Sequence, residues 1–319
     1  MGVNRTIQDR SDLLADVAEM YYLRGMNQME IANQMGVDRS MISRMLSEAR
    51  KQNIVEIRIR RPLTSNANLE SELLRKFALK RAYVLVDHSV DQQELLQRLG
   101  IAGALVLREY LSPGIVLGLS WGSAVSSVVD AVETNETLHI RVVQLVGAMG
   151  AQNTVYDGHG LVQRLAQKLG CEGYFINAPF IVDNPEVANA LLDNQNVKEA
   201  ISLAKKSDIA VLGIGSTNPE YSSFYQAGYV PIEDLNQLSS LGMVGDVCGR
   251  HFNITGDTPE IDFHTRIVTI GDDDLKSIPI RIGVAGGSGK VQAVLGALRA
   301  GYINVLVTDE NLAGELTRI

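Results

Sequence analysis

The sequence predicts an α/β protein in which a small all-α domain precedes a larger, doubly wound α/β domain. From residue 82 onward, short runs that are apolar on both faces alternate with amphipathic helical stretches, a pattern typical of a parallel sheet covered by helices on both sides. Between residues 14 and 50, apolar residues recur at helical spacing instead. A length of 319 residues suits about two domains, and we place them at residues 1–61 and 62–319.

Residues 27–52 predict two short helices joined by a tight turn. Asn27 and Glu30 have the spacing of a helix N-cap and its reciprocal partner. Gly36 follows the first helix, where glycine can adopt a left-handed φ without a Cβ clash, and Asp38 can cap the second helix. The apolar stripe of the second helix consists of Ile42, Met45, Leu46 and Ala49. This arrangement is typical of a helix-turn-helix unit.

The opposite face of the second helix is polar, and it favours binding to double-stranded DNA. Its side chains are charged, form hydrogen bonds or are small enough for close approach, as a helix in the major groove requires. We expect base contacts from Arg39, Ser40, Ser43 and Arg44, and phosphate contacts from Gln28 and Arg50. The alternative is a helical hairpin that merely has one polar face. A helical stripe at 14–22 and a strand-like alternation at 55–60 support the DNA-binding interpretation.

Charge is divided unevenly along the chain. Residues 1–61 contain ten Lys and Arg against eight Asp and Glu, a net charge of +2. Because the whole chain has a net charge of −8, residues 62–319 carry −10. The acidic part would repel a phosphate backbone, which assigns DNA contact to the N-terminal domain. Because +2 is weak for tight binding by one copy, we expect a homo-oligomer, a dimer or tetramer, on the operator.

The larger domain begins with a linker and a helix. Small polar residues follow Pro62 as far as residue 68, and an amphipathic helix over 69–77 then either joins the domain or forms a dimerising stalk. Predicted buried strands cover 82–86, 115–119, 140–146, 209–214, 280–285 and 304–308. Predicted helices cover 91–110, 122–132, 158–169, 185–206 and 290–300.

Three loops rich in glycine and hydroxyl groups stand after predicted strands, at 118–123, 213–217 and 286–290. Ligands of such sheets gather beyond the carboxyl ends of the strands. Glycines let backbone N–H groups approach an anion, a helix start adds positive potential, and Lys290 adds a full charge. A tight strand–helix turn explains any one of these loops. Three at equivalent positions favour a phosphate or polyol site.

Several motifs occur together along the chain. They run from Tyr21-Tyr22 through the helix-turn-helix to RKQNIVEIRI, and continue with GLSWGSAV at 118–125, Leu212 to Ser216, GDVCGRHFN at 245–253, GVAGGSGK at 283–290 and GYINVLVTDE at 301–310. With these motifs the chain resembles the SorC family of bacterial sugar-responsive transcriptional regulators over nearly its whole length. The resemblance implies an effector domain related to sugar-phosphate isomerases and CoA transferases, a sugar or sugar-phosphate effector, and a dimeric or tetrameric DNA-bound form.

The resemblance also implies ligand contacts by position. It implies that the GLSWGS loop contacts the ligand, that Asp246 binds sugar hydroxyls and that Lys290 pairs with phosphate or a ring oxygen. The motif usually seen as GRFFD reads GRHFN here, with His251 and Asn253, so the identity of the effector stays open. The predicted effector-binding residues are Ser120, Trp121, Gly122, Ser123, Gly215, Asp246, His251, Gly286, Gly287 and Lys290.

Two enzyme motifs are mimicked but incomplete. Residues 118–122 spell G-x-S-x-G, the nucleophile elbow of serine hydrolases, yet no histidine follows His264 to complete the triad after the last strands. GSGK at 287–290 fails as a P-loop because Val284 stands where a glycine is required and Val291 follows the lysine.

A sugar-phosphate isomerase is the more serious enzyme alternative. Asp246 and His251 would have to act as its acid and base. The N-terminal DNA-reading unit counts against it, because a dedicated enzyme has no use for one. The sequence therefore predicts a regulator, either repressor or activator, of a carbohydrate or polyol operon and no catalytic residues.

The composition predicts no metal site, no cofactor and no contact with a membrane. Cys171 and Cys248 have no metal-ligand spacing and no disulfide framework, which suits a reducing cytoplasm, and we expect both to be buried. The five histidines form no paired helical ligand motif. Residues 110–129 are uncharged, but Pro113 and several glycines and serines interrupt them, so we expect a strand, a loop and a helix start there, not a membrane span.

Overall fold

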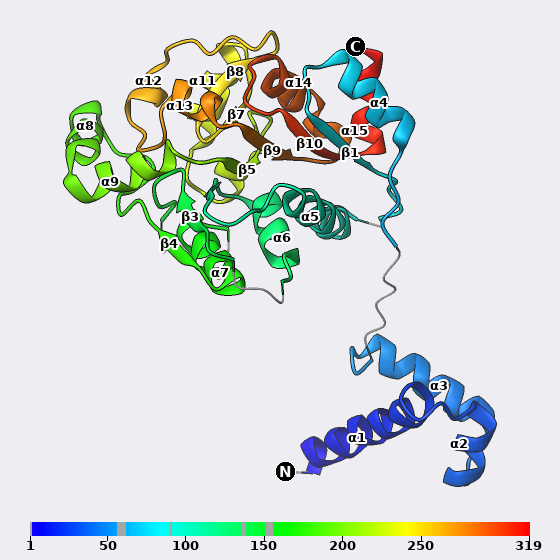
Figure 1. Ribbon diagram of the computed structural model, residues 1–319. Coiled ribbons are helices and arrows are strands. Elements are labelled where there is room, and N and C mark those ends of the chain that lie inside the picture. Colours follow the sequence, from blue (N-terminus) through cyan, green and yellow to red (C-terminus); the bar gives the residue numbers. More distant parts are fainter. Residues whose placement is uncertain (1, 56–61, 90, 135–137, 151–155) are drawn as a thin grey trace. The chain divides into compact units, whose positions relative to one another are not determined.

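The computed structural model describes residues 2–55, 62–89, 91–134, 138–150 and 156–319 (Figure 1). The chain divides into two compact units, Met1–Pro62 and Leu63–Ile319, one residue from the boundary that the sequence predicts. The strand-like alternation expected at 55–60 lies outside the described residues apart from Val55.

The described part of the N-terminal unit consists of helices packed around one small core. α1 spans Gly2–Tyr22, α2 spans Gln28–Met35 and α3 spans Arg39–Lys51. Each helix contributes most of its predicted apolar stripe, although Tyr22, at the end of the stripe over 14–22, is exposed. The buried residues are Leu14, Val17, Ala18, Ile31, Ala32, Ile42, Met45, Leu46 and Ala49. Helices as short as α2 are marginal alone in water, so this shared burial stabilises them.

The two ends of α2 follow the predicted chemistry. Asn27 Oδ1 accepts the backbone N–H groups of Met29 and Glu30 at 3.0 Å, and Glu30 Oε2 accepts the N–H of Asn27 at 2.8 Å, which completes a capping box. Gly36 ends the helix with a φ of 67° in the left-handed region. Asp38 occupies the N-cap position of α3, but its side chain makes no capping hydrogen bond there.

The larger unit is built on a parallel sheet whose strands lie in the order β1-β10-β9-β5-β2-β3-β4. The chain moves outward from β2 through β3 to β4 and then returns to the other side of β2 at β5, so the direction of winding reverses between β2 and β5. This topology confirms the predicted doubly wound α/β class. The strands are β1 (Arg81–Leu85), β2 (Val116–Leu119), β3 (Arg141–Gln144), β4 (Glu172–Tyr174), β5 (Ile209–Gly213), β9 (Ile280–Val284) and β10 (Val305–Asp309).

Helices cover both faces of this sheet because successive strand residues point to opposite sides. Val305 and Val307 of β10 belong to the core under α5, α6 and α7, whereas Leu306 belongs to the core under α4, α14 and α15. Figure 1 shows the two sets of helices on opposite sides of the strands. Their bounds are α4 (Ala67–Lys76), α5 (Gln92–Arg108), α6 (Ser123–Ala131), α7 (Gly158–Leu169), α14 (Val291–Arg299) and α15 (Glu310–Arg318).

The structure departs from the sequence prediction in several places. The helix expected at 185–206 is two helices, α8 (Pro185–Asp193) and α9 (Gln195–Ala204), because Asn194 ends the first and caps the second. β4 lacks the apolar run by which the other strands are recognised. Cys248 is buried as expected, but Cys171 is only half-buried.

A small antiparallel sheet was also absent from the prediction. It joins β6 (Gly215–Ser216), β7 (Met243–Val247) and β8 (Arg250–Asn253). Cys248 and Gly249 form the turn between β7 and β8, with positive φ values of 53° and 75°. The remaining helices are α10 (Ser223–Gln226), α11 (Ile232–Ser240), α12 (Asp262–Thr265) and α13 (Asp272–Ser277).

Candidate functional site

The strand order defines a crevice at the carboxyl ends of β2 and β5, where the winding reverses. Ser120 directly follows β2, and its buried Oγ accepts the backbone N–H of Gly213, the last residue of β5, at 3.0 Å. This hydrogen bond ties the two strand ends together. Ligands of doubly wound sheets bind at this kind of switch point.

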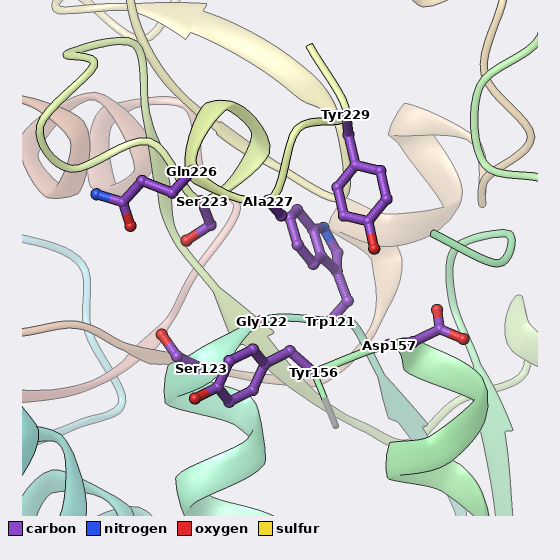
Figure 2. Close-up of a pocket in the computed structure, with 9 residues that line it drawn as sticks. All are labelled: Trp121, Gly122, Ser123, Tyr156, Asp157, Ser223, Gln226, Ala227 and Tyr229. Carbon is purple, nitrogen blue, oxygen red and sulfur yellow. The ribbon is translucent and has the colours of Figure 1, made fainter. Parts of the chain in front are cut away.

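A pocket of about 120 Å³ opens next to Ser120 (Figure 2). Its described lining comes from the β2–α6 loop, the residues at the start of α7, and α10 with the residues that follow it. These residues are Trp121, Gly122, Ser123, Tyr156, Asp157, Ser223, Gln226, Ala227 and Tyr229. Aromatic surface with a few polar groups is the usual chemistry of a small-molecule site.

Trp121 forms a rigid wall of this pocket. Its ring packs against Phe224 with centroids 4.8 Å apart, and Tyr229 meets it edge-on at 6.0 Å and 83°. Phe224 in turn stacks on Phe180 at 5.5 Å within the core. The indole is therefore held in place by protein contacts and needs no ligand to order it.

Two polar groups of the pocket have bonding capacity left. The hydroxyl of Tyr229 is buried and has no hydrogen-bond partner, and burial, with a smaller contribution from Asp157, raises its pKa. Asp157 is nearly buried, and its Oδ1 accepts the backbone N–H of Met149 at 2.9 Å, which leaves Oδ2 available. In Figure 2 this hydroxyl and this carboxylate lie on the same side of Trp121.

Of the predicted effector residues, Trp121, Gly122 and Ser123 line the pocket directly. Ser120 lies behind them, because its hydroxyl is buried against Gly213. The glycine at 122 has a φ of 109°, a backbone conformation that side chains rarely adopt, and this turns the chain from β2 into α6.

Asp246 and Lys290 form a second cluster at the end of β5. Asp246 Oδ2 accepts the N–H of Gly249 at 3.0 Å, and Lys290 Nζ donates to the carbonyl of Ile214 at 2.9 Å. Gly215 leaves no room for a Cβ against the Asp246 carboxylate. Because Ile214 directly follows Gly213, adjacent backbone groups connect this cluster with Ser120 and the pocket.

Burial dominates the ionisation of both members of this cluster. It raises the pKa of Asp246 to about 6, against the opposing effects of the Gly249 hydrogen bond and the Lys290 charge. It lowers the pKa of Lys290 to about 8, against the attraction of Asp246. A pair of charges held this far from water makes strong, specific contacts with any polar group that reaches it.

The structure places Gly286 and Gly287 against a carboxylate of the protein itself. Asp309 Oδ2 accepts the N–H of Gly287 at 2.6 Å, while its Oδ1 caps the start of α15. A Cβ at Gly286 would collide with Leu99 and approach Asp309 Oδ2 to 2.8 Å. The loop amide that the sequence offers to a phosphate is thus bound to Asp309.

His251 lies on β8, away from the described pocket lining. Its backbone N–H donates to His264 Nε2 at 2.9 Å, and its ring packs edge-on against Phe263 at 4.8 Å. Burial lowers the pKa of His251 to about 3 and that of His264 to about 4. Both rings are therefore neutral near pH 7.

The sequence prediction did not include the part of the lining that comes from outside the β2–α6 loop. Tyr156 and Asp157 follow β3 and precede α7, so the rule that singled out the loop after β2 also applies to them. The residues from Ser223 to Tyr229 follow the small sheet, whose strands are too short to be recognised by periodicity. No sequence signal identifies them.

The predicted DNA-contacting residues lie on the outer surface of the N-terminal unit. Arg39, Ser40, Ser43, Arg44 and Arg50 are exposed, and Gln28 is half-buried. Arg44 Nε donates to the carbonyl of Ser40 at 3.3 Å, which folds the side chain along α3.

A bidentate ion pair holds α1 against α3. Arg10 Nε and Nη2 of α1 bind the carboxylate oxygens of Glu48 at 3.0 and 2.7 Å. Glu48 lies on α3 beside the buried Ala49. The pair occupies the one carboxylate of α3, which leaves the charged groups of its outer face basic.

Comparison with known proteins assigns the chain to a family. Residues 61–318 match the family model described as "Putative sugar-binding domain". The chain is 32% identical to the sorbitol operon regulator of Klebsiella pneumoniae over 303 residues, 94% of this chain and 96% of that protein. The chain belongs to the SorC family. This confirms the resemblance drawn from the sequence motifs.

The similarity to SorC-family regulators extends through both units. The transcriptional regulator LsrR of Escherichia coli K12 is 30% identical over 96% of this chain and 94% of its own. The crystal structure of full-length SorC from Klebsiella pneumoniae superposes with a TM-score of 0.73 at 32% identity, covering 97% of this chain and 99% of that one. The probable sor operon regulator from Shigella flexneri gives 0.73 at 31% identity and covers 79% and 99%.

Among the residues that the structure describes, no helix is both long and apolar enough to cross a membrane.

Proposed function

We propose that this SorC-family protein is a transcriptional regulator of a carbohydrate or polyol operon that responds to a sugar-type effector. The observation that carries the proposal is similarity over 94% of the chain to a regulator named for the sorbitol operon, which includes both units. The N-terminal unit binds operator DNA through a helix-turn-helix formed by α2 and α3. The larger unit binds the effector.

In this proposal the outer face of α3 reads the operator. Arg39, Ser40, Ser43 and Arg44 contact base edges, and Gln28 and Arg50 contact phosphates. The exposure of the five residues on α3 supports these roles, and Gln28 is half-buried at the start of α2. A net charge of +2 over residues 1–61 makes one copy a weak binder, so a homo-oligomer, dimer or tetramer, occupies the operator.

The effector binds at the pocket beside Ser120. Trp121, Gly122 and Ser123 supply contacts that the sequence predicts, and Asp157 and Tyr229 add polar contacts that the structure supplies. Asp246 and Lys290, connected to the pocket through Gly213 and Ile214, sense the occupied state. Effector binding shifts the balance between conformations with different operator affinity.

The protein acts without catalysis in this proposal. The hydroxyl of Ser120 is buried and bound to Gly213, so the G-x-S-x-G motif lacks an exposed nucleophile. The ring of His251 is buried and its pKa is lowered to about 3, so it is a weak base near neutral pH and poorly suited to the acid–base role an isomerase needs.

A binding experiment on the full-length protein tests this function. Labelled duplexes from upstream of its own operon are titrated at low ionic strength, with and without a panel of sugars, polyols and their phosphates. We expect specific binding, and a changed affinity with at least one panel member. Lys290→Met should keep DNA binding and reduce the response to effector. A protein that ignores these duplexes, or that converts a sugar phosphate catalytically, contradicts the proposal.

A further inference from the structure

The pocket beside Ser120 has an acidic lining. Asp157 is the one charged side chain among its described lining residues, and neither Lys nor Arg is among them. Residues 151–155, which precede Tyr156 and lie outside the described residues, contain no charged side chain in the sequence. A ligand that enters this pocket therefore meets a negative charge and no lysine or arginine from the described wall.

One feature of the pocket favours an anion, the start of α6 at Gly122 and Ser123, where no side chain caps the helix. A helix start has the effect of about half a positive charge. A phosphate ester carries about −1.5 to −2 near neutral pH. Because the Asp157 carboxylate lies in the same pocket, the partial charge of the helix start does not compensate for its repulsion of a phosphate.

Hydroxyl groups suit the same walls. The buried Tyr229 hydroxyl has no partner and can donate a hydrogen bond, and Asp157 Oδ2 can accept one. A ligand hydroxyl between these two groups satisfies both, which removes the cost of the unpaired buried donor. Ser123, Ser223 and Gln226 offer further polar contacts on the other side of Trp121 (Figure 2).

The size and the aromatic wall limit the ligand further. A pocket volume of about 120 Å³ suits one small molecule. Trp121 and Tyr229 present apolar ring surface to it. A molecule with hydroxyls on its edge and C–H groups on its face fits this combination.

We infer that the effector is an uncharged, unphosphorylated monosaccharide or polyol, bound through its hydroxyls by Asp157 and Tyr229. This inference rests on the proposed function, because it names the ligand class of the same pocket. Asp157 acts as the group that selects against the phosphorylated form.

Matched pairs of ligands test the inference on the full-length protein. D-sorbitol, D-fructose and D-glucose are each compared with their 6-phosphates by isothermal titration calorimetry and thermal shift. We expect at least one free sugar or polyol to bind, with a dissociation constant at least tenfold lower than that of its phosphate. A phosphate that binds more tightly than its parent, or a panel in which no free member binds, overturns the inference.

Two variants separate the roles of the binding groups. Asp157→Asn keeps an oxygen for the Met149 amide, so it should fold, and it should narrow the preference for the free ligand over its phosphate. Tyr229→Phe should raise the dissociation constant of the free ligand about tenfold. It should leave the preference for the free ligand over its phosphate unchanged. Tyr225→Phe, at an exposed tyrosine outside the pocket lining, is the matched control and should change neither. An unchanged preference in Asp157→Asn also overturns the inference.

Operator binding measured in the same samples distinguishes this inference from the proposed function. If a phosphate, and not its parent, releases the operator, the ligand class is wrong and the regulatory function stands. If the free ligand binds but the protein has no affinity for operator DNA, the regulatory function is wrong and the ligand class stands.

Discussion

The Ser120 hydroxyl accepts the Gly213 N–H at 3.0 Å and so links the carboxyl ends of β2 and β5, the two strands between which the sheet reverses its winding. Ser120 is held inside the protein at 1% exposure, and Gly213 is half-buried. The bond therefore fixes the floor of the pocket before a ligand arrives.

Ser120→Ala should lower the free energy of unfolding of the larger unit by about 0.5–1.5 kcal/mol, because it removes the acceptor of the half-buried Gly213 N–H. Urea unfolding measures the loss. Ser123→Ala, at a half-exposed position on the pocket rim, is the control and should change stability little. Stoichiometric labelling of Ser120 by a serine-directed covalent probe would instead show an exposed nucleophile and contradict the assignment.

Arg44→Ala should weaken binding to the specific operator by about 1–3 kcal/mol if the guanidinium pairs with a guanine. Fluorescence anisotropy at fixed salt concentration measures the change. Arg108→Ala removes an exposed arginine of α5 in the other unit and should leave the affinity unchanged. Equal affinity of Arg44→Ala and the unaltered protein would remove Arg44 from the base-reading set.

Gly36→Ala should destabilise the α2–α3 turn by about 1–2 kcal/mol, because an L side chain in the left-handed region is strained. Space is not the cause, since no atom lies within 4 Å of the position a Cβ would take at this φ of 67°. Hydrogen exchange of the α2 and α3 amides reports the change. Gly36→Asn should lose less stability than Gly36→Ala, because asparagine tolerates the left-handed conformation. Identical exchange in all three proteins would argue against backbone strain.

Because of Asp246, the free energy of unfolding should fall as pH rises. Burial raises its pKa from 3.8 to about 6, so the folded protein holds this proton more tightly than the unfolded chain. The resulting stabilisation is complete below about pH 4 and is lost as pH rises through about 6. Its size is on the order of 2–3 kcal/mol.

The difference between Asp246→Asn and the unaltered protein isolates this effect. Urea unfolding from pH 4 to 7.5 should show the unaltered protein losing stability relative to the variant over that range. Asp257→Asn is the control, because hydrogen bonds from Thr255 and Asn253 lower the pKa of Asp257 from 3.8, so its effect on stability falls below this pH range and its difference should stay nearly constant. A difference that does not vary with pH would mean that Asp246 keeps an ordinary pKa in the folded protein.

The regular parts of the fold could be predicted from local patterns. β5 is a continuous apolar run, and β9 is apolar apart from Arg281. The predicted ranges 209–214 and 280–285 each exceed the observed strand by one residue. β6 has two residues and β4 has three, too few for any periodicity. These strands exist because neighbouring backbone groups pair with them, which a local pattern does not encode.

The candidate site was predictable only where its residues follow a long strand. Trp121, Gly122 and Ser123 follow β2 and line the pocket. Gly287 has the same sequence setting after β9, yet its amide binds Asp309, which lies 22 positions further along the chain. Loop composition shows that an amide is available, and the fold determines which carboxylate reaches it.

The sequence by itself determined the α/β class, the capping of α2, the turn at Gly36 and the membership of the SorC family, because each depends on residues close together in the chain or on motifs in fixed order. The tertiary structure alone decided which polar groups remain free for a ligand. Asp309 accepts a hydrogen bond from the Gly287 loop amide. By contrast, one carboxylate oxygen of Asp157 and the hydroxyl of Tyr229 are available to a ligand. The physical reason is that hydrogen-bonding capacity left over at a site depends on contacts between distant segments, which the packing of the sheet and its helices brings together.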